Sequence, residues 1–292
     1  MPRGNGVSAR SPTGGTDLSA FPALLRRVAV AVPGIGAFVA VALLDIPALT
    51  VGFFSLIAGL CGYEAVALLD TGASGAIRGT AAVLTAGASA AIALLPPGLA
   101  LPLVLAPGVL TGLWWIAAGA IEDASGRIAG STGLLAAVCI AFGLLARLRL
   151  DLPSAWIMFL PLLVVWAGDS AAYFIGSAFG RHRMAPSVSP AKSWEGFAAG
   201  MVASMGAAAL AGSVGAGLPL TWMLAAGAAA GAAGVLGDLY ESALKRNAGV
   251  KDSGSLLPGH GGVLDRFDSL LGAVPATWVV LQLMIRSQAG TW

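Results

Sequence analysis

The chain has 292 residues, of which 57% are hydrophobic and 10% are charged, and its mean hydropathy is +0.85. Soluble domains carry about 25% charged residues, so this composition excludes a water-soluble globular protein and indicates a polytopic membrane protein. The formal net charge of +2 is too small to suggest nucleic acid as a partner. The two cysteines, Cys61 and Cys139, lie in apolar runs without CxxC spacing, as expected of small buried side chains.

Residues 1–27 are predicted to form a disordered cytoplasmic tail, because residues 1–20 are polar and rich in Gly, Ser and Pro. A basic tail before an apolar run is also typical of a signal peptide. No convincing cleavage site follows, and many more apolar runs come after the first. The first run is therefore predicted to be retained as a membrane span.

Nine apolar runs are long enough to cross a bilayer, which takes about 20 helical residues. They cover about 28–44, 49–69, 80–95, 99–120, 131–147, 154–179, 196–213, 219–239 and 263–285. Eight or ten spans are the alternatives, since the division between the third and fourth runs depends on Pro96, Pro97 and Gly98. The runs are continuous rather than alternating, which argues against a β-barrel. We therefore expect an all-α polytopic membrane protein, with N-terminal spans in 28–153 and a C-terminal catalytic region in 154–292.

The basic residues predict the orientation, because Lys and Arg are enriched in cytoplasmic loops. If the N-terminus is cytoplasmic and the sides alternate, Arg147, Arg149 and Arg286 are the three of the 16 basic residues that fall outside. The richest polar loops, about 180–195 and 240–262, then both lie on the cytoplasmic side. Both loops can therefore face one soluble substrate, at the inner membrane of the cell.

The polar segment GDLYESALKRNAGVKDSGSLLPGHGGVLDRFDSL (237–270) places acids next to two apolar runs. Asp238 is expected to end one helix, and Asp265 and Asp268 to begin the next. If that helix starts at Val263, both carboxylates point from one face. Carboxylates suit a hard cation such as Mg²⁺, which commonly binds one or two of them together with substrate phosphates.

The same segment also supplies cations and a glycine turn. The anion-binding candidates are Lys245, Arg246, Lys251, His260 and Arg266. Glycines at 259, 261 and 262 let the backbone approach a phosphate before a helix N-terminus. This combination predicts phosphoryl or nucleotidyl transfer. The alternative is a solvated cytoplasmic loop, which explains the lysines but not the acids.

Two blocks of the C-terminal half resemble a known family. SALKRNAGVKDSGSLLPGHGGVLDRFD (242–268) is similar, without a departure, to the signature of the phosphatidate cytidylyltransferase, or CDP-diacylglycerol synthase, family. WAGDSAAYFIGSAFGRHRMAPSVSPAKSWEG (166–196) resembles its upstream element, with Ala191 where Lys or Gly is common and Ser193 where Thr is usual. The N-terminal half matches only as a generic run of spans.

The resemblance implies that a phosphatidate phosphate oxygen attacks the α-phosphorus of CTP, giving CDP-diacylglycerol and pyrophosphate for phospholipid synthesis. It implies Mg²⁺ as cofactor, K⁺ as a candidate second cation, and a homodimer in the lipid bilayer. The carboxylates that match the metal ligands are Asp238, Asp265 and Asp268. No protein base is required, because a phosphate monoester is already ionised at neutral pH.

The other site residues have less specific expected roles. Lys245, Arg246 and Lys251 are predicted to hold phosphate oxygens, whereas Arg266 either reaches phosphate or pairs with its neighbouring acids. The residues expected to bind substrate are Asp169, Ser189, Lys192, Ser193, Glu195, Ser242, Asp252, His260, Gly261 and Gly262.

For several of these residues a structural role is the alternative. His260 either donates to a phosphate or stabilises the turn, and Glu195 either binds substrate or complements the dipole of the following helix. Asp169 and Glu64 fall within predicted spans, where an unpaired charge is costly. Asp169 is expected to shape a polar cavity, and Glu64 to pair with another helix.

Three alternatives to this function remain open. A related CTP-dependent enzyme could act on another lipid phosphate, although the complete signature disfavours it. A transporter would explain the spans and Asp169, but not the signature. A catalytically inactive homologue is disfavoured because every acid and base of the signature is present.

Overall fold

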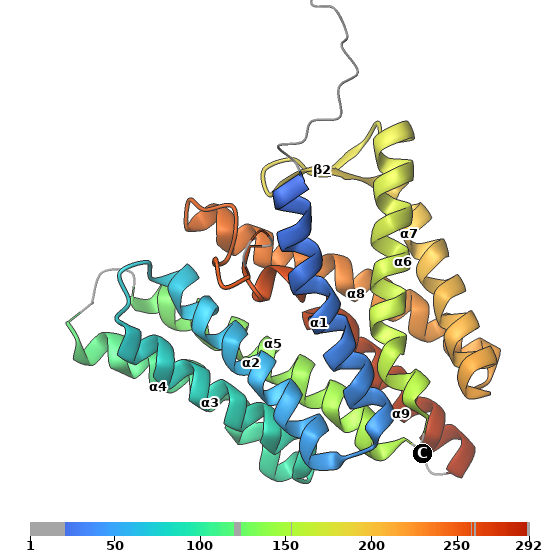
Figure 1. Ribbon diagram of the computed structural model, residues 1–292, viewed down its shortest axis with the longest axis horizontal. Coiled ribbons are helices and arrows are strands. Elements are labelled where there is room, and N and C mark those ends of the chain that lie inside the picture. The colour runs from blue at the N-terminus through green and yellow to red at the C-terminus, as the bar shows by residue number, and fades with distance from the viewer. Residues whose placement is uncertain (1–20, 120–123, 153, 258, 260, 291–292) are drawn as a thin grey trace, which may run out of the picture.

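The computed structural model describes residues 21–119, 124–152, 154–257, 259 and 261–290, and this part of the chain is helical apart from one short hairpin (Figure 1). In chain order the elements are α1 (Phe21–Leu44), α2 (Pro47–Leu69), α3 (Gly75–Leu94), α4 (Pro97–Ala117), α5 (Ala124–Asp151), α6 (Ala155–Phe179), β1 (Arg183–Ala185), β2 (Ser189–Ser193), α7 (Trp194–Ala208), the π-helix η2 (Ala209–Gly215), α8 (Leu220–Asn247), the 3₁₀ turn η3 (Leu264–Arg266) and α9 (Leu270–Ala289).

The helices form two groups that α8 and α9 connect. In the first group α2 and α5 pack on α3, and α4 packs on α3 and α5. In the second group α6 packs along α7. Helix α8 contacts α6 and α7 but also reaches α2, while α9 packs on α8 and α5 (Figure 1). Residues of α8 therefore lie where the two halves of the chain meet.

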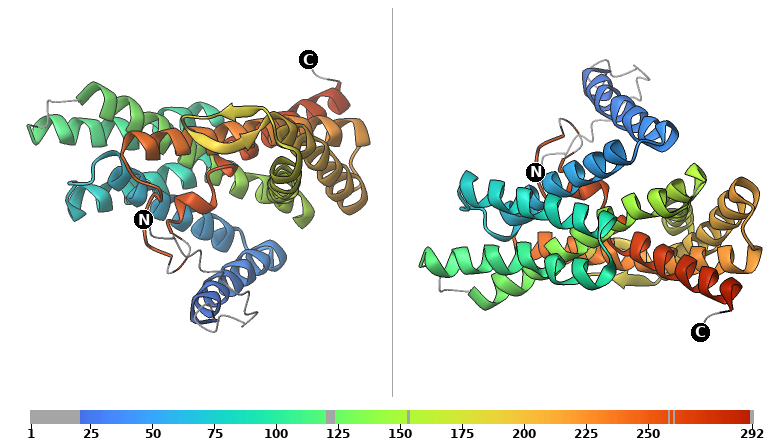
Figure 2. Two further views of the ribbon diagram at one scale, coloured as in Figure 1. Left: turned by 90° about the horizontal axis from the view of Figure 1, so that it is seen from above. Right: turned by 90° about the horizontal axis from the view of Figure 1, so that it is seen from below.

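The prediction of a polytopic all-α membrane protein is confirmed. Eight helices of the described chain, α2 to α9 with η2 continuing α7, are long and apolar enough to cross a membrane. The predicted first span falls in α1, in which the shorter apolar stretch Val32–Leu44 was found. Helix α1 stands away from the other helices (Figure 2) and contacts them through Phe38, whose ring lies edge-on to Phe54 and Phe159.

Small residues, of which the chain has many with 41 glycines, let the helices approach closely. A Cβ atom added to Gly227 of α8 would lie 2.6 Å from Cα of Met205, and one added to Gly231 would lie 2.8 Å from Cβ of Ser204. The run 227–234 therefore makes a helix contact and is not a nucleotide-binding loop.

Two predicted helix boundaries are wrong. Asp238 does not end its helix, because α8 continues to Asn247, supported by an i,i+4 ion pair between Glu241 and Lys245. The last helix begins at Leu270 rather than at Val263. Hence Asp265 and Asp268 do not share a helix face.

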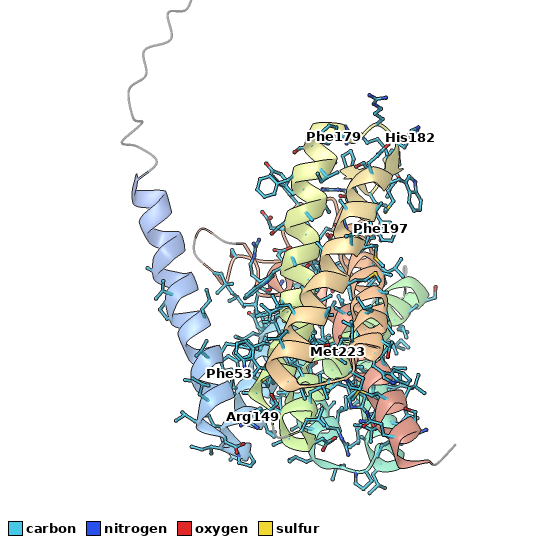
Figure 3. The ribbon with its side chains drawn as sticks, turned by 90° about the vertical axis from the view of Figure 1, so that its right-hand side faces the viewer. Phe53, Arg149, Phe179, His182, Phe197 and Met223 are labelled. Atoms are coloured by element: carbon cyan, nitrogen blue, oxygen red, sulfur yellow. The ribbon has the colours of Figure 1, made fainter. Side chains whose placement is uncertain are left out.

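The polar segment 180–195, expected to be a loop, contains an antiparallel hairpin. Arg183 pairs with Ser193 and Ala185 with Ser189, and the backbone N–H of Trp194 donates to the carbonyl of His182 at 2.9 Å. Ser193 then caps α7 by accepting from the backbone N–H of Gly196 at 3.1 Å. The hairpin lies at the end of α6 where Figure 3 labels Phe179 and His182, and Arg149 lies at the opposite end of the molecule.

Candidate active site

One face of α8 carries the polar side chains of the candidate site. Asp238, Glu241, Ser242 and Lys245 follow the i, i+3, i+4, i+7 spacing of a single helical face. The hydroxyl of Ser242 donates to Oδ1 of Asp238 at 3.1 Å. At the N-terminal end of this stripe Asp238 contacts the hairpin, and at its C-terminal end Lys245 contacts the loop after α8.

At the C-terminal end of the stripe, a buried ionic group joins α8 to η3. Lys245 Nζ lies 2.6 Å from Oε2 of Glu241 and 2.8 Å from Oδ1 of Asp265. The Glu241 side chain is fully buried and that of Asp265 is 5% exposed. Because charges are costly to bury without partners, this ammonium group holds both acids in place.

Asp265 organises the loop between α8 and α9, residues 248–269, called the signature loop from here on. Besides Lys245, its carboxylate accepts from the backbone N–H of Ser253 at 2.9 Å and of Gly262 at 2.8 Å. Burial favours the neutral acid, but the hydrogen bonds from Lys245 and from these two N–H groups outweigh burial and hold the pKa of Asp265 below its ordinary value. Asp265 is therefore an ionised acceptor whose oxygens are both occupied.

The glycines of the signature loop have two distinct uses. Gly259 and Gly261 have φ values of 80° and 82°, which side-chain-bearing residues rarely adopt. The turn that they make is closed by a hydrogen bond from Leu257 N–H to the Gly261 carbonyl at 3.0 Å. Gly262 lacks a positive φ and lies against side chains, among them Glu64 of α2.

The hairpin contacts α8 at two positions, Asp238 and Arg246. Lys192 Nζ of β2 lies 2.7 Å from Oδ2 of Asp238, and both side chains are partly exposed. Arg246 Nε donates to the carbonyl of Val188 in the hairpin turn at 3.3 Å. The upstream block and the signature segment, separate in sequence, are thus brought together along the C-terminal part of α8.

A second carboxylate, Asp268, lies near Asp238. Burial, followed by the negative charge of Asp238, raises the pKa of Asp268 to about 6. Asp169 of α6 also lies within electrostatic range of Asp238. Lys192 is the ion-pair partner of Asp238 among the described residues, so this group carries excess negative charge.

Part of this group fits a divalent cation. In the described chain no three or more His, Cys, Asp or Glu side chains lie close enough to form a metal site by themselves. Asp238 and Asp268 supply the one or two carboxylates with which Mg²⁺ is usually bound alongside substrate phosphates. Asp265 fits less well, because its oxygens are already occupied by three donors.

A small cavity of about 20 Å³ lies beside this group between α6, α7 and α8. Asp169, Ser204 and Ser269 are its polar lining residues, and Phe197 and several glycines complete the wall. Its volume suits a single water molecule. Asp169 lines this cavity, but most of the wall is apolar, so its role in shaping a polar cavity stays a prediction.

The other predicted site residues lie on the signature loop, in the hairpin or at the start of α7. Lys251, Asp252 and Arg266 are exposed on the signature loop, and His260 lies outside the described residues. Ser189 and Ser193 form the ends of β2. Glu195 accepts from the backbone N–H groups of Arg181 and His182 and lies 2.6 Å from His182 Nδ1, so it fastens the base of the hairpin.

Two buried acids were not predicted in their observed places. Glu241 was overlooked, although its i,i+4 spacing from Lys245 is a recognisable signal. Glu64 was expected to pair with another helix, but it accepts from the backbone N–H of Leu264 at 2.9 Å. No local pattern in the sequence indicates that contact.

Residues 25–284 match the family model described as the cytidylyltransferase family. The chain belongs to the cytidylyltransferase family. The match covers both groups of helices, so the N-terminal spans belong to the family as much as the signature does.

Several curated relatives resemble this cytidylyltransferase in part. A phosphatidate cytidylyltransferase of Haemophilus influenzae is 48% identical over 39% of this chain and 41% of its own length. One of Bacillus subtilis is 43% identical over 46% of this chain and 51% of its own length. The uncharacterized protein YnbB of Escherichia coli is 41% identical over 42% of this chain and 46% of its own. The chain thus spans about half the length of the curated relatives it matches.

Proposed function

We propose that this membrane cytidylyltransferase transfers the cytidylyl group of CTP to phosphatidate, giving CDP-diacylglycerol and pyrophosphate at the cytoplasmic face of the cell membrane. The observation that carries the proposal is the contact between Lys192 of the hairpin and Asp238 of α8. It unites the two sequence blocks that resemble phosphatidate cytidylyltransferases. The identity of 48% with a relative of that name supports the same acceptor.

The reaction is a displacement at phosphorus. An ionised phosphate oxygen of phosphatidate forms a bond to the α-phosphorus of CTP, the bond from that phosphorus to the bridging oxygen of the β-phosphate breaks, and pyrophosphate leaves with the electron pair. No proton needs to be removed from the nucleophile at neutral pH. The chain therefore has to position two anions and reduce their repulsion.

The residues divide this work between them. Asp238 and Asp268 would hold Mg²⁺, which when bound supplies positive charge to the phosphates of both substrates. Lys192 and Arg246 present cationic groups from the hairpin side, where the phosphates would enter. Lys245 and Asp265 hold the signature loop in shape, so that its backbone N–H groups keep a fixed geometry.

The test is an assay of the purified protein with CTP, phosphatidate and Mg²⁺, followed by detection of CDP-diacylglycerol and pyrophosphate. A panel containing an isoprenoid phosphate and an ether-lipid phosphate examines the acceptor. Turnover with phosphatidate supports the proposal. CTP consumption with another lipid phosphate alone would contradict the acceptor, and solute transport in proteoliposomes without CTP consumption would contradict the reaction.

A further inference from the structure

We propose that Glu64, on α2 in the N-terminal half, is a positioning residue that sets the shape of the signature loop for catalysis. This inference deepens the proposed function and rests on it. The Glu64 side chain is 2% exposed, and a buried carboxylate is retained only where it has partners. Its partner here is the loop, 200 residues away in sequence.

The contact is made to the backbone of the loop. Oε2 of Glu64 accepts from the N–H of Leu264 at 2.9 Å, the residue directly before Asp265. Asp265 in turn accepts from Gly262 and Ser253. Residues 262–265 are therefore held by two carboxylates, one from the loop itself and one from α2.

Two glycines leave room for the Glu64 carboxyl group. A Cβ atom on Gly254 would lie 2.6 Å from Cδ and 2.9 Å from Cγ of Glu64, and its three nearest atoms would all belong to Glu64. A Cβ atom on Gly262 would lie 2.7 Å from Oε2 of Glu64. Neither glycine has a positive φ, so the missing side chain, rather than an unusual backbone, explains why glycine stands at both positions.

Through these contacts the N-terminal half of the chain helps to fix the signature loop. Lys245 holds Asp265 from α8, and Glu64 holds Leu264 from α2, so the loop is fixed between the two halves of the chain. Glu64 contacts neither Lys192 nor Asp238 in the described structure. It acts on the reaction through the loop, and the property that matters is the reach of an acceptor oxygen to the Leu264 N–H.

Two conservative variants distinguish the effect of the length of the Glu64 side chain from the effect of its charge. Glu64→Gln keeps the length and an acceptor oxygen but loses the charge, and it should keep most of the kcat. Glu64→Asp keeps the charge but withdraws the carboxylate by one methylene, and it should lower kcat about 10- to 100-fold, as expected when a hydrogen bond to a charged group is lost. Asp70→Asn is the matched control and should retain kcat, since Asp70 at the end of α2 accepts from Trp115 at 3.0 Å and pairs with Arg127 rather than with the signature loop.

A double-mutant cycle tests the same contact from the loop side. Gly254→Ala should lower kcat in the native background and cost little more in Glu64→Ala, because the colliding atoms are gone. Hydrogen exchange of the peptide covering residues 249–266 provides a readout that needs no turnover. It should be faster in Glu64→Asp than in the native protein and unchanged in Asp70→Asn.

The outcomes are distinguishable. If Glu64→Asp matches the native protein in kcat and in loop exchange, or if the Gly254 and Glu64 losses multiply independently, the inference is overturned. A native protein that exchanges as expected but makes no CDP-diacylglycerol would overturn the proposed function instead. Loss in Glu64→Gln equal to that in Glu64→Asp would also contradict the inference, because the charge would then matter as much as the reach of the acceptor oxygen.

Discussion

Asp238 lies where the hairpin, α8 and the start of α9 converge. Its carboxylate contacts Lys192 at 2.7 Å and accepts from Ser242 at 3.1 Å. Its negative charge also repels those of Asp268 and Asp169. No other described acid interacts with both sequence blocks in this way. A change confined to this carboxylate should therefore affect chemistry more than folding.

The first prediction concerns the charge of Asp238. Asp238→Asn preserves size and an acceptor for Ser242 but removes the negative charge, so kcat should fall about 100-fold or more. The thermal unfolding temperature in detergent should change little. Asp151→Asn, at an exposed acid at the far end of α5, is the control and should retain activity. Near-native turnover of Asp238→Asn would exclude it as a metal ligand.

If Asp268 is a ligand of Mg²⁺, the Mg²⁺ requirement should depend on pH. A proton competes with a cation for a carboxylate, and the pKa of Asp268 is raised to about 6 by burial and by Asp238. Between pH 7 and pH 5 the ionised fraction should fall from about nine-tenths to about one-tenth. The free Mg²⁺ needed for half-maximal rate should then rise about tenfold. A requirement that is equal at both pH values would remove Asp268 from the ligand set.

At the scale of elements, the contact between α8 and η3 depends on one ammonium group. Lys245→Met would leave Glu241 and Asp265 buried without their counter-ion, which typically costs about 3–5 kcal/mol. The unfolding temperature should drop by on the order of 10 °C. Lys251→Met, at an exposed lysine of the signature loop, is the stability control. Equal unfolding temperatures for the two variants would show that Lys245 is not a structural residue.

The elements that the sequence predicted well are the long apolar ones. Continuous hydrophobic runs identify membrane helices regardless of how they pack, so each predicted span coincides with a helix. The boundaries failed where polar residues continue a helix or interrupt one. Asp238 was expected at a helix end because a charge commonly marks the membrane boundary, yet α8 continues because Glu241 and Lys245 neutralise each other inside the protein.

The site was predictable in composition but not in geometry. The polar segments and motif blocks identified Asp238, Lys192 and Asp265 as candidates, and the alternation of the spans predicted that both blocks lie on one side of the membrane. Their partners depend on tertiary structure. Asp265 accepts hydrogen bonds from α8 and from its own loop, and Glu64 accepts one from the loop although it lies on a helix distant in sequence. No local sequence pattern indicates either arrangement.

For the molecule as a whole, the ends of the helix bundle differ in chemistry. The hairpin, Lys192 and Arg246 gather at one end, whereas Arg149 at the opposite end (Figure 3) is buried and pairs with Asp45 at 2.7 Å. A basic residue that is neutralised inside the protein adds little to a surface-charge bias. Lys192 is itself paired with Asp238, but the exposed Arg181, Arg183 and Arg246 form no ion pair within the described part of the chain, and they favour a cytoplasmic location for the hairpin end.

The last prediction tests this orientation by thiol labelling. The native Cys61 and Cys139 are fully buried, so a single new cysteine can report accessibility without their removal. Ser187→Cys lies in the hairpin turn and Thr221→Cys lies at the start of α8, near Met223 at the other end in Figure 3; both positions are exposed.

In intact bacterial cells a membrane-impermeant maleimide should modify the Thr221→Cys variant and leave the Ser187→Cys variant unmodified until the membrane is permeabilised. The native protein, treated in the same way, measures background labelling. If the hairpin cysteine is modified in intact cells, Lys192 and Asp238 face the outside. CTP made in the cytoplasm could then not reach them, and the proposed reaction would fail together with the orientation.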